Sequence, residues 1–357
     1  MYLLMHENEP VLAFADPEHY EILNEQYVPE LVLSNQLYAF LYDRATKWRG
    51  RETYKGLLYA LDLKDDRSMT EIFDKTYSLS LNDVYWIKKE NDPVSFEEIN
   101  LYDHAFDDNA AKAGFLGVEK RAQGLSPEFT TDGQLGKCFV RENDQIVLLK
   151  RGTTWGSVPG REMYSEYYCA QVLTALGIPH VPYDIVMYQG QKASSCPLVT
   201  DREHAYVPIG VFDYHHEDDI AQDFIKRGFE KELKEMILFD ALVYNYDRHI
   251  GNFGYLKDQK TGAYSFFPLF DHGNAFFPLA TKEDFENLPA YLEKIDYSAI
   301  GLTFEELATH FLKPKDLEIL DRLDHFEITP HPKFQEDVTI YNTFLKKRIA
   351  ELKQLVK

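Results

Sequence analysis

Apolar residues alternate with polar ones in several stretches of the chain and recur at helical spacing in others, which predicts a mixed α and β protein. Alternation and turn residues predict these strand pairs: residues 1–15 around a turn at 7–10, 137–140 with 146–150, 181–188 with 193–200, and 253–256 with 264–269. Helical spacing predicts a helix at 161–176, closed by Gly177, and an apolar helical run that stops at Asp247. Further helices are predicted after Thr303 and at the end of the chain, so the second half should be mainly helical.

The predicted hairpin at 253–269 should bring three polar residues together. Asp247 and Asn252 precede its first strand, and Asp271 follows its second strand. Because the second strand of a hairpin returns beside the first, Asp271 should lie next to Asn252. Two oxygen ligands and a further carboxylate suit the binding of Mg²⁺ on a nucleotide and the transfer of a phosphoryl group. In that chemistry Asp247 would orient or deprotonate the acceptor hydroxyl, and Asn252 and Asp271 would bind the metal.

The sequence around these residues resembles a known group of kinases. Residues 247–253 have the order Asp-Arg-His-x-x-Asn-Phe, and Asp-His-Gly follows at 271–273. Protein kinases also place an Asn five residues after the catalytic Asp and follow with Asp-Phe-Gly. The Asp-Arg-His order is similar to that of the atypical kinases, namely the phosphoinositide-kinase group and the bacterial HipA-type kinases, and we interpret the chain as HipA-like. Three further motif residues are expected to support the loops: Arg248, His249 and Gly273.

The resemblance extends to the segment before this motif. Lys150 ends a predicted strand, and the resemblance implies that it holds the α- and β-phosphates of ATP. Glu166 lies on the following predicted helix and, by the same resemblance, should pair with Lys150 and aim it at the phosphates. Lysines commonly end exposed strands, so the position of Lys150 is not a specific signal by itself. Lys137 or Arg151 could take its role instead. The resemblance thus implies that Lys150 and Glu166 act in catalysis together with Asp247.

Two further segments are expected to contact the nucleotide. Gly133 and Gly136 precede the first strand of the small lobe and could turn their backbone N–H groups toward phosphate oxygens. The segment lacks the three glycines of the usual kinase loop, so the resemblance implies only that a phosphate loop lies at this position. Val199 and Thr200 leave the second hairpin where a kinase connects its lobes, so adenine should bind beside them.

The resemblance implies a two-lobed, protein-kinase-like α+β fold with an N-terminal extension. Residues 123–200 would form a small β-rich lobe, and residues 201–357 a mainly helical large lobe with the catalytic and metal-binding loops. Residues 1–122 would form an extension of unknown role. The sequence of this extension shows no recognisable chemistry, although such a region often selects a substrate or a partner.

The expected function is that of an ATP-dependent serine/threonine protein kinase, which transfers the γ-phosphoryl group of Mg-ATP to a protein hydroxyl. The HipA resemblance alone adds a toxin or regulatory role with an antitoxin as a possible partner. Two alternatives stay open. One is a small-molecule or lipid kinase with the same core, because fold and motif are shared among substrate classes. The other is a non-catalytic, nucleotide-binding interaction module, that is, a pseudokinase.

Composition limits the binding partners and the cellular compartment that we expect for the protein. A formal net charge of −21 argues against direct nucleic-acid binding, which needs a positive face. No apolar run approaches the length that spans a bilayer, and the first residues turn acidic too soon for a secretory signal. Cys138, Cys169 and Cys196 form no Cys-x-x-Cys pair. We therefore expect a cytoplasmic protein without membrane contact.

Overall fold

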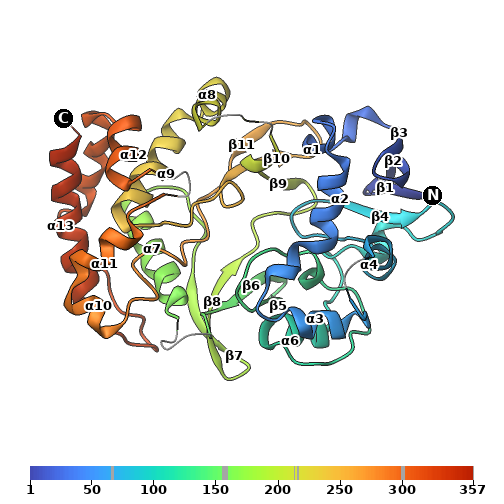
Figure 1. Ribbon diagram of the computed structural model, residues 1–357, viewed down its shortest axis with the longest axis horizontal. Coiled ribbons are helices and arrows are strands. Elements are labelled where there is room, and N and C mark those ends of the chain that lie inside the picture. The colour runs from blue at the N-terminus through green and yellow to red at the C-terminus, as the bar shows by residue number, and fades with distance from the viewer. Residues whose placement is uncertain (66–67, 155–159, 213, 215–216, 299–301, 357) are drawn as a thin grey trace.

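The computed structural model describes the chain apart from residues 66–67, 155–159, 213, 215–216, 299–301 and 357. Only the backbone is described at 217 and 218. Strands in the described part form three antiparallel sheets, and helices dominate the C-terminal half, as expected for an α+β protein. Figure 1 shows the N-terminal region at one end of the molecule and the C-terminal helices at the other, with the middle of the chain between them.

The small-lobe sheet has the strand order β5-β6-β8-β7. Its elements are β5 (Lys137–Glu142), β6 (Gln145–Arg151), β7 (Asp184–Tyr188) and β8 (Gln191–Pro197), with α7 (Glu162–Leu176) between β6 and β7. Both predicted hairpins are confirmed, and each turns through two residues with positive φ: Asn143 and Asp144, then Gln189 and Gly190. The predicted helix is confirmed too, because Gly177 ends α7 in the left-handed conformation.

A second sheet, β9-β10-β11, follows the connection to the large lobe. Its strands are β9 (His204–Pro208), β10 (Gly254–Asp258) and β11 (Tyr264–Phe266), so the predicted hairpin is confirmed and a third strand that was not predicted joins it. Gly254 allows this pairing, because a Cβ at that position would lie 2.2 Å from the carbonyl oxygen of Val207. After β11 the chain returns toward the small lobe, where Leu269 pairs with His180. The residues that follow Leu269 are thereby carried to the junction of the lobes.

Helices pack around one large apolar core in the C-terminal half. They are α8 (Glu217–Arg227), α9 (Glu230–Val243), α10 (Lys282–Glu286), α11 (Leu288–Ile295), α12 (Phe304–Phe311) and α13 (Thr339–Leu355). The capping box from Thr303 to Glu306 begins α12 as predicted. The helical run before Asp247 ends earlier than predicted, at Val243, because Tyr244 adopts a left-handed conformation with φ of +55°. None of the helices in the described ranges has the length and apolar character that a bilayer crossing requires.

The N-terminal extension has its own sheet, with the order β3-β2-β1-β4. Its elements are β1 (Tyr2–His6), β2 (Glu9–Asp16), β3 (His19–Ile22), α1 (Glu30–Leu33), α2 (Leu37–Thr46), α3 (Tyr54–Ala60), α4 (Met69–Thr76), β4 (Tyr85–Lys89), α5 (Phe96–Ile99) and α6 (Asp108–Leu116). The strand pair predicted for residues 1–15 is confirmed as β1 and β2. Packing crosses the expected boundary at residue 122, because Ala111 and Phe115 of α6 pack with Cys138 and Leu149 of the small lobe.

The extension also contacts both lobes through single acidic residues. Glu52 accepts a hydrogen bond from the backbone N–H of Gly136 at 3.0 Å, just before β5. Glu30 of α1 pairs with Lys257 of β10 and accepts a hydrogen bond from the Tyr264 hydroxyl of β11 at 2.6 Å. Figure 1 shows α1 beside the β9–β11 sheet, and α3 near the small-lobe sheet. The extension therefore spans the junction between the lobes.

Candidate active site

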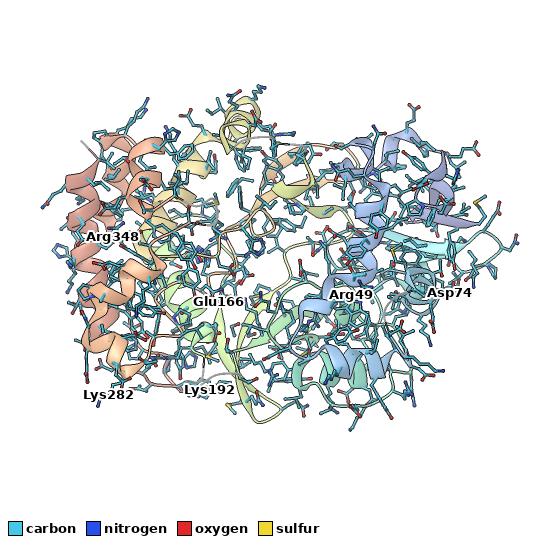
Figure 2. The ribbon with its side chains drawn as sticks, in the orientation of Figure 1. Arg49, Asp74, Glu166, Lys192, Lys282 and Arg348 are labelled. Carbon is cyan, nitrogen blue, oxygen red and sulfur yellow. The ribbon has the colours of Figure 1, made fainter. Side chains whose placement is uncertain are left out.

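Lys150 joins two carboxylates from opposite sides of the junction. Its Nζ lies 2.6 Å from Oε1 of Glu166 and 2.5 Å from Oδ1 of Asp271. Glu166 is fully buried on α7, near the middle of the molecule in Figure 2, and its Oε2 accepts a hydrogen bond from the backbone N–H of His272 at 2.8 Å. The structure therefore brings together three of the residues that the sequence singled out, and the helix carboxylate touches both the lysine and the loop that carries Asp271.

The charges in this cluster stabilise one another. Burial opposes the charge on Lys150, but Asp271 and Glu166 outweigh burial and raise the Lys150 pKa. Burial would also raise the Asp271 pKa, yet the charges of Lys150 and Lys137 outweigh it and hold that pKa below its ordinary value. For Glu166 burial dominates and raises the pKa, although Lys150 opposes the shift. At neutral pH the lysine is thus charged and the Asp271 carboxylate is ionised.

The backbone at Asp271 is strained. Its φ of +55° lies in the left-handed region, which for a residue with a Cβ costs about 1–3 kcal/mol. Its N–H donates to the hydroxyl of Tyr183 at 3.1 Å, which helps to hold this conformation. Strained residues of this kind persist where surrounding contacts enforce them, and they cluster at functional sites. The geometry of Asp271 is therefore set by its surroundings as well as by local preference.

Asp247 and Asn252 share a tight loop after α9. The Nδ2 of Asn252 donates to the backbone oxygen of Asp247 at 3.2 Å, and Asn252 Oδ1 has no donor among the described residues. Asn274 donates to Oδ2 of Asp247 at 2.8 Å, which leaves Oδ1 for another partner. Burial raises the pKa of Asp247, the Asn274 hydrogen bond opposes the shift, and repulsion from Asp271 adds to it. Asp247 is accordingly a stronger base than an exposed carboxylate.

Arg248 anchors this loop with all five of its N–H donors. Two of them bind the carboxylate of Asp240 on α9 at 3.0 and 3.1 Å. Two others reach the backbone oxygens of Asn252 and Phe270 at 2.9 and 2.6 Å, and the fifth reaches Nδ1 of His272 at 2.9 Å. Arg248 thus supports the loops, as expected, and ties the segment of Asn252 to that of Asp271. Asp240 was not among the predicted site residues, and its signal in the sequence is a lone carboxylate within an apolar helical run.

The three other motif residues have different surroundings. His272 is fully buried and accepts from Arg248, so it is the neutral tautomer with its proton on Nε2, and burial holds its pKa well below the ordinary value. His249 is exposed, and its Nδ1 accepts from the N–H of Gly251 at 3.1 Å, next to the metal-ligand candidate Asn252. Gly273 lies 3.4 Å, measured from a Cβ built there, from Glu162, which is ordinary contact. Space alone therefore does not demand a glycine at 273.

The expected phosphate loop is occupied by contacts within the protein. Gly133 has a φ of +100°, and its N–H donates to the carboxylate of Asp132 at 2.6 Å. The N–H of Gly136 donates to Glu52 of the extension at 3.0 Å. Because both N–H groups have protein acceptors here, phosphate contact at Gly133 and Gly136 stays a prediction. The participation of Glu52 was not foreseen, because nothing local in its sequence marks it.

The three basic candidates of the small lobe separate clearly. Lys150 alone contacts Glu166 and Asp271, whereas Arg151 pairs with Glu52 at 2.9 Å. Lys137 stands directly opposite Lys150 on the neighbouring strand, so both side chains leave the same face of the sheet. The Lys137 ammonium donates to the backbone oxygen of Asp132 at 2.7 Å, and burial together with the charge of Lys150 lowers its pKa to about 7. Lys137 therefore lies beneath the loop of Gly133.

The segment expected to contact adenine lies beside an apolar group between the lobes. Val199 is partly buried there and packs near Leu148 of β6 and Phe267, which follows β11. Thr200 is buried, and its hydroxyl donates to the backbone oxygen of Leu81 in the extension. Tyr183 belongs to the same group and bonds Asp271, so this apolar surface borders the charged cluster. Adenine binding at Val199 and Thr200 stays a prediction.

The donor set suits a magnesium ion held together with a nucleotide. Among the described residues no group of three or more His, Cys, Asp or Glu side chains could hold a metal by itself. Asn252 offers an amide oxygen, and Asp271 bonds Lys150 through Oδ1 while its other carboxylate oxygen makes no hydrogen bond with a described residue. Mg²⁺ prefers such oxygens and usually takes one or two carboxylates plus substrate phosphates. The residues therefore fit the ion.

Comparison with known proteins gives distant structural likenesses. No protein-family profile and no curated protein matches the chain. Solved structures that it resembles include the proinflammatory kinase CtkA of Helicobacter pylori, with 16% identity and a TM-score of 0.47 over 62% of this chain and 90% of CtkA. They also include a chain of the HipA, HipB and operator DNA complex from the Shewanella oneidensis MR-1 toxin–antitoxin system, with 11% identity and a TM-score of 0.48 over 99% of this chain and 96% of that one.

Both likenesses are distant in sequence and in fold. One of these proteins is described as a kinase, and the other belongs to a HipA complex. At such identities and TM-scores they carry no argument about activity, substrate or partner. The expectation that this chain does not bind nucleic acid stays a prediction. A HipA-like, two-lobed kinase fold is the architecture that the chain resembles.

Proposed function

We propose that the protein is an ATP-dependent kinase of the HipA-like type that phosphorylates serine or threonine in a protein. The convergence of Lys150 with Glu166 and Asp271 supports this most strongly, because it joins both lobes through one buried ammonium. A buried charge of this kind is costly unless it serves several partners. Lys150 is well suited to leave Asp271 for the phosphates of a nucleotide, with Glu166 keeping it in place.

The remaining residues take roles that match their contacts. Asn252 and Asp271 would hold Mg²⁺, which when bound neutralises phosphate charge and orients the nucleotide. Asp247 orients the acceptor hydroxyl through Oδ1, since Asn274 occupies its other oxygen. The hydroxyl oxygen forms a bond to the γ-phosphorus, the bond from that phosphorus to the β–γ bridging oxygen breaks, and the hydroxyl proton passes to Asp247. The raised pKa of Asp247 favours its acceptance of that proton.

The test is phosphoryl transfer from labelled ATP with Mg²⁺ to proteins of a host lysate, followed by mass-spectrometric mapping of labelled sites. We expect label on serine or threonine with the wild type and about 10²-fold less or lower with Asp247→Asn and Asp271→Asn. Asp324→Asn, an exposed carboxylate of the same lobe, should behave as wild type. Label that persists in both site variants would refute the assignment.

Two other outcomes would replace the proposal. Turnover of small molecules or lipids that far exceeds protein labelling would identify a kinase of the same core with another acceptor. ATP binding without transfer to any acceptor would identify a pseudokinase. A regulatory or toxin role with an antitoxin-like partner rests on the resemblance alone, and the test is expression in the host: growth arrest with wild type and none with Asp247→Asn would support it, and normal growth with both would refute it.

A further inference from the structure

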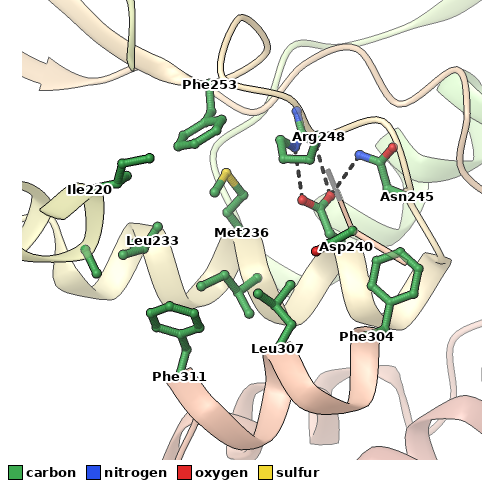
Figure 3. Close-up of a pocket in the computed structure, with 13 residues that line it drawn as sticks. Ile220, Leu233, Met236, Asp240, Asn245, Arg248, Phe253, Phe304, Leu307 and Phe311 are labelled. Carbon is green, nitrogen blue, oxygen red and sulfur yellow. Dashed lines mark hydrogen bonds and ion pairs between the residues drawn. The ribbon is translucent and has the colours of Figure 1, made fainter. Parts of the chain in front are cut away.

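The main chain around Asp247 is fixed from several sides. Asp240 of α9 accepts hydrogen bonds from Asn245 at 2.9 Å and from Arg248 at 3.0 and 3.1 Å, as Figure 3 shows. These two donors lie on either side of Asp247 in the chain. Asn252 adds a bond of 3.2 Å to the backbone oxygen of Asp247. None of these contacts reaches the Asp247 carboxylate, so they fix the position of the residue but not the direction of its side-chain oxygens.

The carboxylate of Asp247 receives a single hydrogen bond from the described residues. Its donor is Nδ2 of Asn274, which lies 2.8 Å from Oδ2. The torsion that turns a carboxylate about its last bond has only broad, roughly two-fold preferences, so a partner is needed to hold it. Phosphoryl transfer depends mainly on the placement of the reacting groups. The direction of the other oxygen, Oδ1, is therefore set by the bond from Asn274.

Tyr246 fixes which end of the Asn274 amide faces Asp247. The Tyr246 hydroxyl lies 3.3 Å from Oδ1 of Asn274 and donates to it. The NH₂ group then faces Asp247, where an amide oxygen would repel the carboxylate instead of binding it. One neighbour thus needs an acceptor and the other needs a donor, so the amide satisfies both in one orientation only. The three side chains form a continuous chain of hydrogen bonds that runs from Tyr246 through Asn274 to Asp247.

The segment that carries Asn274 is strained and anchored in the core. Phe276 and Phe277 follow it, with φ of +52° and +51°, a region that bulky side chains rarely adopt. Both rings are fully buried and pack against Tyr341 of α13. The N–H of Phe276 donates to the backbone oxygen of Val243 at 2.9 Å, where α9 ends. Strain of this kind persists only where the surroundings enforce it, so the core holds this segment against the helix that precedes the proposed catalytic loop.

We propose that Asn274 is a positioning residue, which aims the carboxylate of Asp247 at the acceptor hydroxyl, and that Tyr246 holds Asn274 in the orientation this requires. The inference rests on the proposed function, because it needs Asp247 to serve the acceptor. Asn274 follows Asp271 by three residues, so a single loop would place both the metal ligand and the support of the acceptor side. Loss of Asn274 should therefore slow phosphoryl transfer and leave ATP binding at Lys150 nearly unchanged.

The test measures label transfer from ATP with Mg²⁺ to proteins of the host lysate over a range of ATP concentrations. Asn274→Ala should lower the apparent kcat about 10- to 10²-fold, the loss of a hydrogen bond to a charged group, with a nearly unchanged KM for ATP. Tyr246→Phe should lower it about two- to tenfold, the loss of a neutral hydrogen bond. The matched control is Asn342→Ala on α13, which removes two bonds to the backbone of Ile328, of 2.8 and 3.0 Å, and should leave kcat unchanged.

A double variant separates positioning from support of the fold. If Asn274 acts through Asp247, then Asn274→Ala should not lower the residual rate of Asp247→Ala any further, whereas a structural role would lower it by the same factor as in the wild type. Circular dichroism verifies that each variant folds, and Asn274→Asp, which keeps the shape but loses the donor, is the second variant if Asn274→Ala does not fold.

The role of Asn274 is overturned if its folded variants transfer phosphate at the wild-type rate, or if the loss is equal with and without the Asp247 carboxylate. An unchanged kcat in Tyr246→Phe would overturn the part of Tyr246. A wild type that labels no protein would refute the proposed function and this role with it. An active wild type with equally active Asn274 variants would refute the role alone, so the two failures are distinguishable.

Discussion

The ion pair between Asp240 and Arg248 anchors the loop proposed to be catalytic, and Asp240→Asn tests this anchor with almost no change of shape. Both side chains are nearly inaccessible, at 5% and 6% exposure, and two hydrogen bonds of 3.0 and 3.1 Å join them. The substitution leaves an oxygen that can accept one of these bonds but removes the charge. Arg248 cannot release its proton, so its buried charge would lose its counterion.

The expected cost follows from that burial. Removing one partner of a buried pair costs about 3–5 kcal/mol, against a total free energy of unfolding of about 5–15 kcal/mol for a folded domain. Because Arg248 also binds the segments of Asn252 and Asp271, the loss should reach the proposed catalytic loop. We therefore expect Asp240→Asn to lower the free energy of unfolding by about 3–5 kcal/mol and to reduce phosphoryl transfer even where the variant is folded.

Equilibrium urea denaturation measures the first effect. The matched control is Asp321→Asn, whose partner Lys353 lies at 2.5 Å in an exposed pair, with side-chain exposures of 64% and 36%. That pair should contribute about 1 kcal/mol or less. Adding Arg248→Met to Asp240→Asn should recover part of the stability, because the uncompensated charge is then gone. Equal losses for Asp240→Asn and Asp321→Asn, or no recovery in the double variant, would refute the reasoning.

Three further predictions concern pH and the phosphate loop. The folded pKa of His272 lies well below the ordinary value of 6.5, so the unfolded chain binds more protons than the folded chain below pH 6.5. The free energy of unfolding should therefore fall as the pH drops from about 7 to 5, by up to ~1.4 kcal/mol per pH unit. Measured by urea denaturation, this pH dependence should be weaker in His272→Asn. Lys137, with a pKa of about 7, should gain a proton when nucleotide phosphates approach, so calorimetry near pH 8 in buffers of different ionisation enthalpy should show proton uptake that Lys137→Met abolishes. Glu52→Gln should raise the KM for ATP about two- to tenfold with little change in kcat, because it loosens Gly136 and Arg151. An unchanged or lower KM would contradict the prediction for Glu52. A stability that does not change with pH would contradict the prediction for His272, and the absence of proton uptake would contradict the prediction for Lys137.

Local signals predicted the hairpins well, because their turn residues carry the information. Asn143 with Asp144 and Gln189 with Gly190 all adopt the positive φ that two-residue turns require. The return of Asp271 toward Asn252 was predicted from the hairpin of β10 and β11, whose second strand runs back beside the first. Strand β9 was missed because it is a short strand that ends in Pro208 and pairs with β10, which is distant in sequence. Nothing in its own residues identifies that partner.

The site residues also include some that local sequence motifs predicted and some that they did not. Asp247, Asn252 and Asp271 belong to spaced motifs, and the structure places their loops around one arginine. Asp240 and Glu52 are different, because their roles depend on which residues tertiary packing brings to them. Asp240 has only the signal of a carboxylate within an apolar helical run, and Glu52 has none, because an acidic residue in a sequence is most often solvated. Only the tertiary structure shows which residues Asp240 and Glu52 contact.

The two attachments of the extension have a mechanical consequence. Glu52 is fastened to the loop before β5, whereas Glu30 is fastened to Lys257 and Tyr264 on the far side of the junction. Separation of the two lobes would therefore break hydrogen bonds of the extension as well as the contact between Lys150 and Asp271, so the extension adds to the resistance of the junction against opening.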